Sequence, residues 1–377
     1  MAMEQVAYEA LRKDIFAAIW REIDPLEREI EDTEHIPHDK LWPALTGMRA
    51  FALLIPEQWG GLGLSVSQYV PIIAEFGKTQ GGIRALVHVH NSMCHALSAL
   101  GTPAQCVEVL PAAARGEKSV AFALTEPDYG TGADLGSRAT KVDGGWAING
   151  RKHLITNSDF ASHFMVFAKT GDREVSCLLT PRTAPGLKIE VYPHTMGAKG
   201  GAHGLLTFTE CFVPDSAVMG DVGKGLDQLE EALEISRVFV AASSLGTAEY
   251  ALELSVARAK QRVTFKKPIA ERQAIQRYLA EMATDVYALR LMLADVAARW
   301  DRGERIPAQA SMTKLFGLEA VGRVTDRALL VFGGIGYTRA HKIERLYRDA
   351  RLNWLEEGTP TIQQLVIARQ VIAGFRP

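Results

Sequence analysis

Residues 119–142, SVAFALTEPDYGTGADLGSRATKV, mark the point at which the sequence changes from helical periodicity to the short apolar runs typical of strands. The first of these runs ends at Thr125, and Glu126-Pro127 breaks it. The backbone N–H groups of the flexible segment at 130–132 could face an anionic or ring-shaped ligand. Taken alone, however, this segment is more simply interpreted as a surface loop.

Beyond this point, β-branched and aromatic runs bounded by turn residues continue to about residue 222. Their spacing is that expected of an antiparallel barrel or sandwich. Asp143-Gly144-Gly145 and Asn149-Gly150 are hairpin signals, because glycine accepts a positive φ without steric cost. At 155–157, the Ile-Thr-Asn triplet places a hydroxyl group at the end of a predicted strand.

Helical periodicity occupies both flanking regions. Leu11, Ile15 and Ile19 recur at helical spacing, and a long apolar segment ends at Gly101, a natural helix stop. After the β region, helical spacing returns at 226–263, 271–302, 307–332 and 359–374. We therefore predict an α+β protein with an N-terminal α-helical domain (1–118), a middle β domain that forms an antiparallel barrel or sandwich (119–222) and a C-terminal four-helix-bundle domain (223–377).

The composition of the chain excludes several classes of protein. Of its 377 residues, 47% are hydrophobic and 23% are charged, and the formal net charge is −2. This balance argues against disorder and against a basic surface for nucleic acid. No apolar run reaches the roughly 18 residues of a membrane span, and the N-terminus lacks a signal-peptide pattern. We expect a soluble cytoplasmic protein with no membrane or nucleic-acid partner.

The four cysteines are scattered, and no pair has CxxC spacing. Buried free thiols in a reducing cytosol are therefore expected. Histidines and a cysteine also cluster at 83–95, IRALVHVHNSMCH. On a helix, however, these side chains would not all lie on the same face. His90 and Cys94 share one face, whereas His88 and His95 share another. We therefore predict no metal site, and one or two pocket-lining histidines instead.

Two further segments are ambiguous when each is taken alone. Residues 262–276, RVTFKKPIAERQAIQ, could hold phosphates, although a solvated basic loop is the commoner explanation of such a run. Glycines at 333–336 break the end of a helix, so the backbone there can approach a ligand closely. They do not form a GxGxxG fingerprint and no strand precedes them, which excludes a Rossmann interpretation.

The last informative stretch is LNWLEEGTPTIQQLVIARQ, residues 352–370, where Glu356 and Glu357 precede a predicted helix. Acidic residues at a helix start suit its dipole, so a solvated helix start is the simple explanation.

Together and in this order, the segments resemble the acyl-CoA dehydrogenase family of FAD enzymes, of the short-chain or glutaryl-CoA type. The resemblance rests on LPAAARGEKSVAFALTEP, INGRKHLITN, GGIGYTRAHKIERLYRDA and EEGTPTIQ.

The resemblance implies that Glu357 is the catalytic base. It would remove the α-proton of an acyl thioester while the β-hydrogen passes as hydride to flavin N5, giving a trans-2-enoyl thioester. We expect burial to raise the pKa of Glu357 towards about 6–7 once substrate is bound. The dipole of a helix with Thr359 as N-cap and Pro360 as first residue opposes this shift. Glu356 is expected to face outward or to support its neighbour.

By the same resemblance, the backbone N–H of Glu357 and a ribityl hydroxyl of FAD would bind the thioester oxygen. Some relatives carry the base on another helix, immediately before the position of Arg237. Ser236 occupies that position here, which favours Glu357. The predicted substrate-binding residues are Arg84, His88, Ser236, Arg237 and Gly358.

The predicted FAD contacts fall into two groups. Phe122, Leu124 and Thr125 match one flavin wall, Ile155 and Thr156 match the other, and Thr131 matches a pyrophosphate contact. Arg262, Thr264 and Phe265 would hold the adenosine diphosphate part from a neighbouring subunit, Gly333 and Gly334 would allow its close approach, and Thr359 would contact the cofactor. The resemblance therefore implies a homotetramer or homodimer.

Arg84 matches the position at which glutaryl-CoA dehydrogenases hold the distal carboxylate of their substrate. A buried arginine with no protein partner would be costly, and a substrate carboxylate would satisfy it. An ordinary surface or helix-capping arginine is the alternative.

The sequence departs from the family at four places. Leu154 replaces a tryptophan, Lys266 replaces a common glycine, Leu330 replaces a common glutamine, and the loop after Pro127 is longer than usual. These departures put in doubt the flavin contacts and the usual electron acceptor, an electron-transferring flavoprotein. Three alternatives remain open: a flavin-dependent monooxygenase or oxidase of the same fold, a dehydrogenase that acts on acyl-carrier-protein thioesters rather than acyl-CoA, and a non-catalytic acyl-binding protein.

Overall fold

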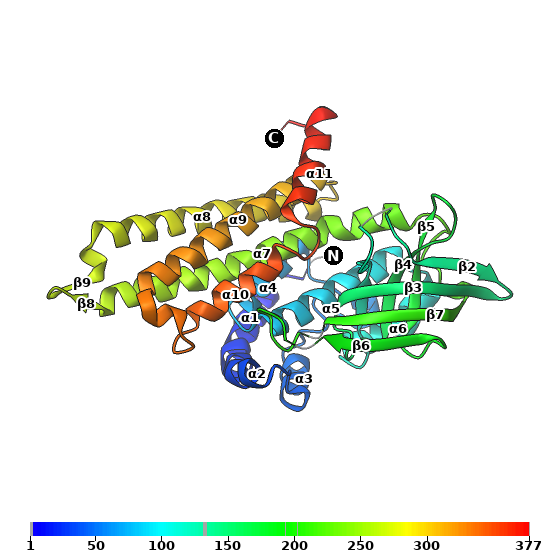
Figure 1. The fold of residues 1–377 in the computed structure, drawn as a ribbon, viewed down its shortest axis with the longest axis horizontal. Coiled ribbons are helices and arrows are strands. Elements are labelled where there is room, and N and C mark those ends of the chain that lie inside the picture. The colour runs from blue at the N-terminus through cyan, green and yellow to red at the C-terminus, as the bar shows by residue number, and fades with distance from the viewer. Residues whose placement is uncertain (1–2, 131–133, 193, 202, 377) are drawn as a thin grey trace.

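The computed structural model describes residues 3–130, 134–192, 194–201 and 203–376. Figure 1 shows a β-sheet at one end of the molecule, most of the N-terminal helices near its middle, and long helices that run from the sheet to the opposite end. The α–β–α order predicted from the sequence is confirmed. The exact domain limits, at 118 and 222, stay a prediction.

The N-terminal helices begin at well-defined caps. Ser65 and Thr102 each form a capping box with the glutamine three residues later, which satisfies free N–H groups of the first turn. The helix that carries Arg84 and His88 is buried along most of its length. These helices are α1 (Gln5–Ala18), α2 (Glu27–Thr33), α3 (His38–Gly47), α4 (Val66–Phe76), α5 (Gly81–Leu100) and α6 (Pro103–Ala114), with short π or 3₁₀ turns at Ile19–Ile23, Asp24–Leu26 and Glu57–Trp59.

The middle region forms one curled sheet with the strand order β1-β4-β2-β3-β7-β6, and β5 also pairs with β4. Most pairs are antiparallel, as predicted, but β4 runs parallel to β1 and meets β2 in parallel. Because β2 and β3 intervene between β1 and β4, the chain can enter β4 in the same direction as β1. The strands are β1 (Val120–Ala123), β2 (Arg138–Val142), β3 (Gly145–Thr156), β4 (His163–Lys169), β5 (Val175–Pro181), β6 (Leu187–Tyr192) and β7 (His203–Pro214).

One of the two predicted hairpin turns is correct. Asp143-Gly144 joins β2 to β3, and Gly144 has φ 71°. Asn149-Gly150 is not a turn, because it lies inside β3 at a register shift in the pairing with β7. A Cβ on Gly150 would stand 2.3 Å from the Ser137 hydroxyl oxygen, so this glycine serves a close approach of two chain segments.

The C-terminal helices pack around α7, which is 37 residues long. A small β8–β9 hairpin lies at the far end of α7, and α11 projects from the bundle (Figure 1). α10 was not among the helical segments predicted. The elements are α7 (Gly225–Gln261), β8 (Val263–Thr264), β9 (Lys267–Pro268), α8 (Gln273–Asp301), α9 (Pro307–Phe332), α10 (Ile343–Asn353) and α11 (Pro360–Ile372), with 3₁₀ turns at Asp215–Ala217, Ile269–Glu271 and Gly333–Tyr337.

Two further sequence expectations can be compared with the structure: one concerns the cysteines and the other concerns membrane-spanning helices. All four cysteines are buried free thiols, as predicted: Cys94, Cys106, Cys177 and Cys211. Within the described ranges, no helix combines the length and the apolar character needed to cross a bilayer.

Candidate active site

Glu357 lies on the short loop between α10 and α11. Its backbone has φ 53°, a left-handed conformation that is uncommon for a residue other than glycine, and Gly358 follows with φ 92°. The Glu357 side chain is only 8% exposed. A strained backbone persists only where surrounding contacts stabilise it, and such residues cluster at functional sites. The buried carboxylate on this backbone therefore marks a candidate site.

Two side chains that the sequence analysis did not single out hold this loop. The Nζ of Lys314, on α9, donates to the carbonyl oxygens of Glu356 and Gly358 at 2.5 Å each. The Nε2 of Gln363, on α11, donates to the carbonyl oxygens of Glu357 at 3.1 Å and Gly358 at 3.0 Å. Lys314 and Gln363 are both fully buried. Burial lowers the pKa of Lys314 to about 8, and the nearby charges of Glu357 and Glu356 oppose this.

The Glu357 carboxylate faces a buried histidine. Its Oε1 lies 3.6 Å from Nε2 of His88, which is also 3.4 Å from the Ser236 hydroxyl. Ser92 lies 3.3 Å from the other ring nitrogen of His88. The second carboxylate oxygen, Oε2, has no hydrogen-bond partner among the described residues. The predicted residues His88 and Ser236 are therefore brought to Glu357.

The direction of the Glu357 pKa shift follows from these neighbours. Burial is the largest single influence and raises the pKa, but the hydrogen bond and charge of His88, the charge of Lys314 and the Ser236 hydroxyl together lower it below the ordinary value. Without substrate, therefore, the electrostatic neighbours outweigh burial. The expectation of a raised pKa concerns the substrate complex and stays a prediction.

Arg237 lies on α7, directly after Ser236, and is buried. Its Nε has no hydrogen-bond partner within the part of the chain that the structure describes. Burial lowers the pKa of Arg237, while the charges of Glu357, Glu234 and Glu230 raise it. A buried guanidinium with an unpaired N–H beside a carboxylate can bind a polar group of a ligand.

The structure corrects the expected surroundings of Arg84, whereas its role in binding a substrate carboxylate stays a prediction. The side chain is 3% exposed, so Arg84 is not a surface residue. It also has protein partners: Nη1 lies 2.7 Å from the Glu356 carboxylate, and Nη2 donates to Asn353 at 2.7 Å. Glu356 is therefore not outward-facing, since its side chain is 15% exposed and pairs with Arg84. The partners lie 272 and 269 residues from Arg84, so local patterns did not reveal them.

Five predicted flavin contacts meet where β1 and β3 end. The His153 N–H donates to the Thr125 carbonyl at 2.9 Å, which joins the two strand ends. The Thr156 hydroxyl lies 3.1 Å from Nδ1 of His203, which the sequence analysis did not select. Thr131 lies outside the described residues. The five predicted residues at these two strand ends are Phe122, Leu124, Thr125, Ile155 and Thr156.

A buried ion pair supports this strand junction. Lys152, on β3, lies 2.7 Å from Glu126, with side-chain exposures of 0% and 2%. Lys152 also donates to the Leu124 carbonyl, and Glu126 accepts from the N–H groups of Gly136 and Ser137. Burial lowers the pKa of Lys152 to about 8, against the opposing charge of Glu126. The pair therefore fixes both the backbone at the β1–β3 junction and the end of the loop that follows it.

The second group of predicted FAD residues lies in a different place. A cavity of about 710 Å³ is lined by three arginines together with Thr264, Gly333 and Gly334. Nothing lies within 4 Å of a Cβ built on either glycine, so a ligand can reach their backbone. Guanidinium groups suit the pyrophosphate of FAD. The arginines are Arg258, Arg262 and Arg272.

Two predicted cofactor residues differ from the expected details. Phe265 stands at the tip of the β8–β9 hairpin, 92% exposed, and does not line the cavity. Phe265 and Lys266 both have positive φ, so the turn retains its shape although lysine replaces the usual glycine. Thr359 is the N-cap of α11 by position, but its side chain makes no capping hydrogen bond.

In Figure 1, β3 ends near the middle of the molecule, where the sheet meets the helices, and the β8–β9 hairpin, whose Thr264 lines the arginine-lined cavity, lies at the end away from the sheet. Ser236, beside Glu357, and Arg262 are 26 residues apart along α7, which corresponds to about 39 Å at 1.5 Å per residue. The structure therefore does not bring the two predicted FAD groups together within one chain.

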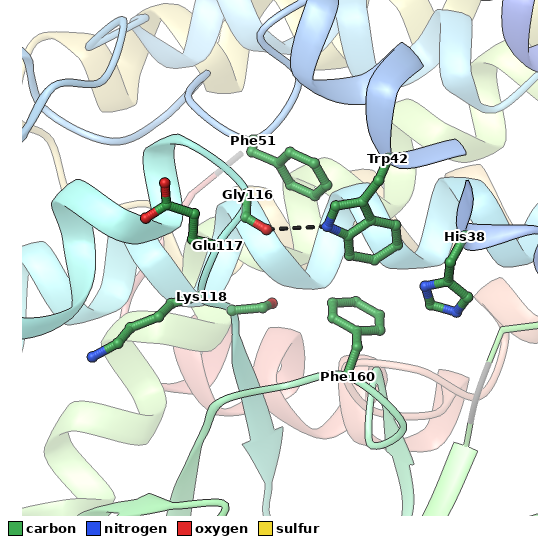
Figure 2. A pocket seen from close by; sticks show the side chains of 8 residues that line it. His38, Trp42, Phe51, Gly116, Glu117, Lys118 and Phe160 are labelled. Carbon is green, nitrogen blue, oxygen red and sulfur yellow. Dashed lines mark hydrogen bonds between the residues drawn. The ribbon is translucent and has the colours of Figure 1, made fainter. Parts of the chain in front are cut away.

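A second cavity, of about 260 Å³, lies between the N-terminal helices and the sheet (Figure 2). The rings of Trp42, Phe51 and Phe160 surround it, and the Trp42 indole donates to the Gly116 carbonyl at 3.0 Å. None of the predicted site residues lines this cavity.

His90, which lies on the same helix as His88, has hydrogen-bond partners on both ring nitrogens. Nδ1 of His90 lies 3.0 Å from the Ser119 hydroxyl, and its Nε2 lies 3.0 Å from the Phe51 carbonyl. His90 is thus a satisfied core residue. Among the residues that the structure describes, no group of three or more histidine, cysteine or acidic side chains could hold a metal ion.

Comparisons with known proteins agree with the observed fold. Models of the acyl-CoA dehydrogenase N-terminal, middle and C-terminal domains match residues 6–117, 121–211 and 223–372. An acyl-CoA dehydrogenase of Bacillus subtilis is 33% identical over 380 residues, covering 99% of this chain and 99% of that protein. The caffeyl-CoA reductase-Etf complex subunit CarC of Acetobacterium woodii is 32% identical over 352 residues, covering 91% and 92%.

The structure of butyryl-CoA dehydrogenase from Megasphaera elsdenii is also similar, with a TM-score of 0.93, 27% identity and 99% coverage of each chain. The chain therefore belongs to the acyl-CoA dehydrogenase family, whose members bind FAD and are oxidoreductases acting on CH–CH groups.

Proposed function

We propose that this protein dehydrogenates an acyl-CoA thioester, with Glu357 as the base that removes the α-proton. The observation that carries the proposal is the Glu357 carboxylate itself, buried on a strained loop with Oε2 unpartnered among the described residues. His88, Ser236 and Lys314 favour its ionised form, which is the form that can accept a proton. FAD, when bound, supplies the acceptor for the β-hydrogen as hydride.

The backbone N–H of Glu357 is the proposed donor to the thioester oxygen. The hydrogen bonds of the described residues do not use this N–H, so it is free to bind an acceptor. A donor aimed at the thioester oxygen stabilises the negative charge that develops there as the α-proton leaves. Carboxylate and N–H come from the same residue, so both reach the same end of the substrate.

FAD would be held by two copies of the chain. Its flavin would contact the β1–β3 junction of one copy, and its pyrophosphate would contact the arginine-lined cavity of another. The separation of about 39 Å along α7 supports this arrangement. Phe265 supports it as well, since an exposed aromatic ring beside the cavity is available to a second copy or to the cofactor.

We propose an acyl chain without a distal carboxylate as the preferred substrate. Glu356 and Asn353 already satisfy the Arg84 guanidinium, so an anionic acyl end would have to displace Glu356. The relative named as a subunit of a reductase–Etf complex supports an electron-transferring flavoprotein as redox partner.

A second candidate is oxygen chemistry on the same fold. Leu154 stands where relatives carry tryptophan, and its side chain is 55% exposed beside the flavin wall. A more open flavin edge would favour access of oxygen. An intact, buried Glu357 argues for dehydrogenation instead, and oxygen uptake after reduction distinguishes the two.

An anaerobic absorbance titration with butyryl-, octanoyl- and glutaryl-CoA tests the proposal. Bleaching of the flavin band is expected, with butyryl-CoA more effective than glutaryl-CoA. A stronger effect of glutaryl-CoA would show that Arg84 leaves Glu356 to bind the substrate. Flavin that none of the three thioesters bleaches, or a protein that takes up no FAD, would contradict the proposed reaction.

A further inference from the structure

Three consecutive carbonyl groups, those of residues 356–358, accept hydrogen bonds from just two side chains, Lys314 and Gln363. Lys314 forms no salt bridge among the described residues, and both of its hydrogen bonds go to the main chain. Burying a lysine without a carboxylate partner is costly, as its lowered pKa of about 8 indicates. The contacts that compensate this cost are those to the loop that carries Glu357.

Because of the geometry of the peptide bond, these contacts also set the direction of the Glu357 N–H. In a trans peptide, the carbonyl of one residue and the N–H of the next point in opposite directions. The Glu356 carbonyl shares its peptide group with the Glu357 N–H. Because Lys314 holds that carbonyl toward α9, the Glu357 N–H must point away from α9. Gln363 fixes the next peptide, between Glu357 and Gly358, in the same way.

The backbone of the loop needs this support. Glu357 has a left-handed conformation, and a chain free to relax would leave it because its Cβ is crowded there. Gly358 contacts the same pair of side chains, and a Cβ on it would lie 2.9 Å from Gln363 Nε2. The two side chains therefore close on the loop from α9 and from α11.

We propose that Lys314 and Gln363 are positioning residues. They hold the loop so that both the carboxylate and the thioester-binding N–H of Glu357 keep their orientation toward the substrate. The inference rests on the proposed function. The charge of Lys314 adds to this role, since it lies close enough to Glu357 to favour the carboxylate over the carboxylic acid.

The test uses FAD-loaded full-length protein and the variants Lys314→Met and Gln363→Met, which keep side-chain volume and remove the donors. Thr325→Val is the matched control, because Thr325 is buried on the same helix α9 and bonds only to its own helix. Stopped-flow bleaching with butyryl-CoA gives a limiting rate and a half-saturating concentration. Thermal unfolding and flavin content verify that each variant is folded and loaded.

A second readout isolates proton removal. The thioester 3,3-dimethylbutyryl-CoA has α-hydrogens but no β-hydrogen, so in D₂O only α-exchange is open to it. Lys314→Gln, which restores N–H donors on a shorter side chain, provides the conservative comparison.

We expect Lys314→Met to lower the limiting bleaching rate and α-exchange by about 10²-fold, as for the loss of a transition-state hydrogen-bond donor. The half-saturating concentration should change by less than about threefold, because the lost contact acts on the transition state. Gln363→Met should lower both rates by about tenfold, Lys314→Gln should recover part of the loss, and Thr325→Val should match the wild type.

Folded, FAD-loaded Lys314→Met and Gln363→Met with wild-type rates would overturn the inference while leaving the proposed function intact. If Lys314→Met fails to fold, the bleaching and exchange rates of folded, FAD-loaded Gln363→Met test the inference by the same criterion. A wild-type protein that neither bleaches nor exchanges would instead overturn the proposed function, and this inference with it.

Discussion

At the scale of single residues, the candidate site is governed by what surrounds one carboxylate. Burial alone would favour protonated Glu357, but a histidine, a lysine and a hydroxyl group lower its pKa in the substrate-free protein. A thioester that displaces water and separates Glu357 from His88 would restore the influence of burial. The base would thus be ionised before substrate binds and more basic once the substrate is in place.

His88→Asn should raise the pKa of Glu357, because it removes the neighbour that lowers this pKa most. The acid limb of the pH profile for flavin bleaching should move to higher pH by about one unit. A carboxyl group with a lowered pKa stabilises the fold above its unfolded pKa and loses this contribution as pH falls through the folded value. The variant should therefore lose stability at neutral pH and approach the wild type in acid.

His90→Asn is the control for this prediction, because His90 is buried on the same helix but contacts Ser119 and Phe51. An acid limb that stays in place in His88→Asn, or moves equally in His90→Asn, would contradict the assignment. The ionisable groups near Glu357 are His88 from α5, Arg237 from α7, Lys314 from α9 and Glu356 on its own loop.

At the scale of elements, the features predicted correctly from the sequence are those that depend on local sequence patterns. The order of helices and strands, the start of α11 at Pro360 and the end of β3 at Thr156 follow from patterns within a few residues. Asn149-Gly150 was misassigned because a bulge and a turn use the same residue types. The parallel β1–β4 pair was missed because strand direction depends on chain topology.

The long-range contacts that support the site were missed for a different physical reason. Lys314 lies 42 residues before the carbonyl it holds, Lys152 lies 26 residues after Glu126, and Arg84 lies 272 residues before Glu356. Each looks like an ordinary charged residue within its own segment. Only the packed fold shows that these charges are buried and which groups they meet.

Lys152→Met tests the buried ion pair at the β1–β3 junction. It leaves Glu126 without its cation, and breaking a buried pair from one side costs about 3–5 kcal/mol. Urea unfolding should show this loss of stability, and FAD should dissociate more readily because Lys152 also holds the Leu124 carbonyl. The double variant Lys152→Met/Glu126→Gln should recover part of the stability; unchanged stability in Lys152→Met would contradict the role assigned to the pair.

At the scale of the whole molecule, we propose that one chain holds parts of two FAD half-sites. The β1–β3 junction and Glu357 lie toward one end of α7, and the arginine-lined cavity lies at the other. A cyclic arrangement of copies would place the arginine cavity of one copy beside the flavin wall of another. Each copy would then complete the FAD site of its neighbour.

Mixing two inactive variants tests this arrangement. Glu357→Gln lacks the base, and Arg262→Ala lacks a pyrophosphate contact on the other half-site. If the two residues act on one FAD from different copies, random mixing should restore roughly a quarter of the wild-type bleaching, because half of the pairs are mixed and each contains one intact site. No recovery, after exchange of copies has been verified with a labelled chain, would place both residues at the FAD of one copy.

The most direct test of Glu357 as the base is α-proton exchange in Glu357→Gln. The variant keeps size and hydrogen-bonding capacity but cannot accept the proton. FAD-loaded wild type and variant are incubated in D₂O with 3,3-dimethylbutyryl-CoA, and deuterium at the α-carbon is measured by mass spectrometry. The account predicts that the wild type incorporates deuterium and that Glu357→Gln retains FAD but loses exchange by at least about 10³-fold. Exchange at the wild-type rate in the FAD-loaded variant would show that another group removes the proton.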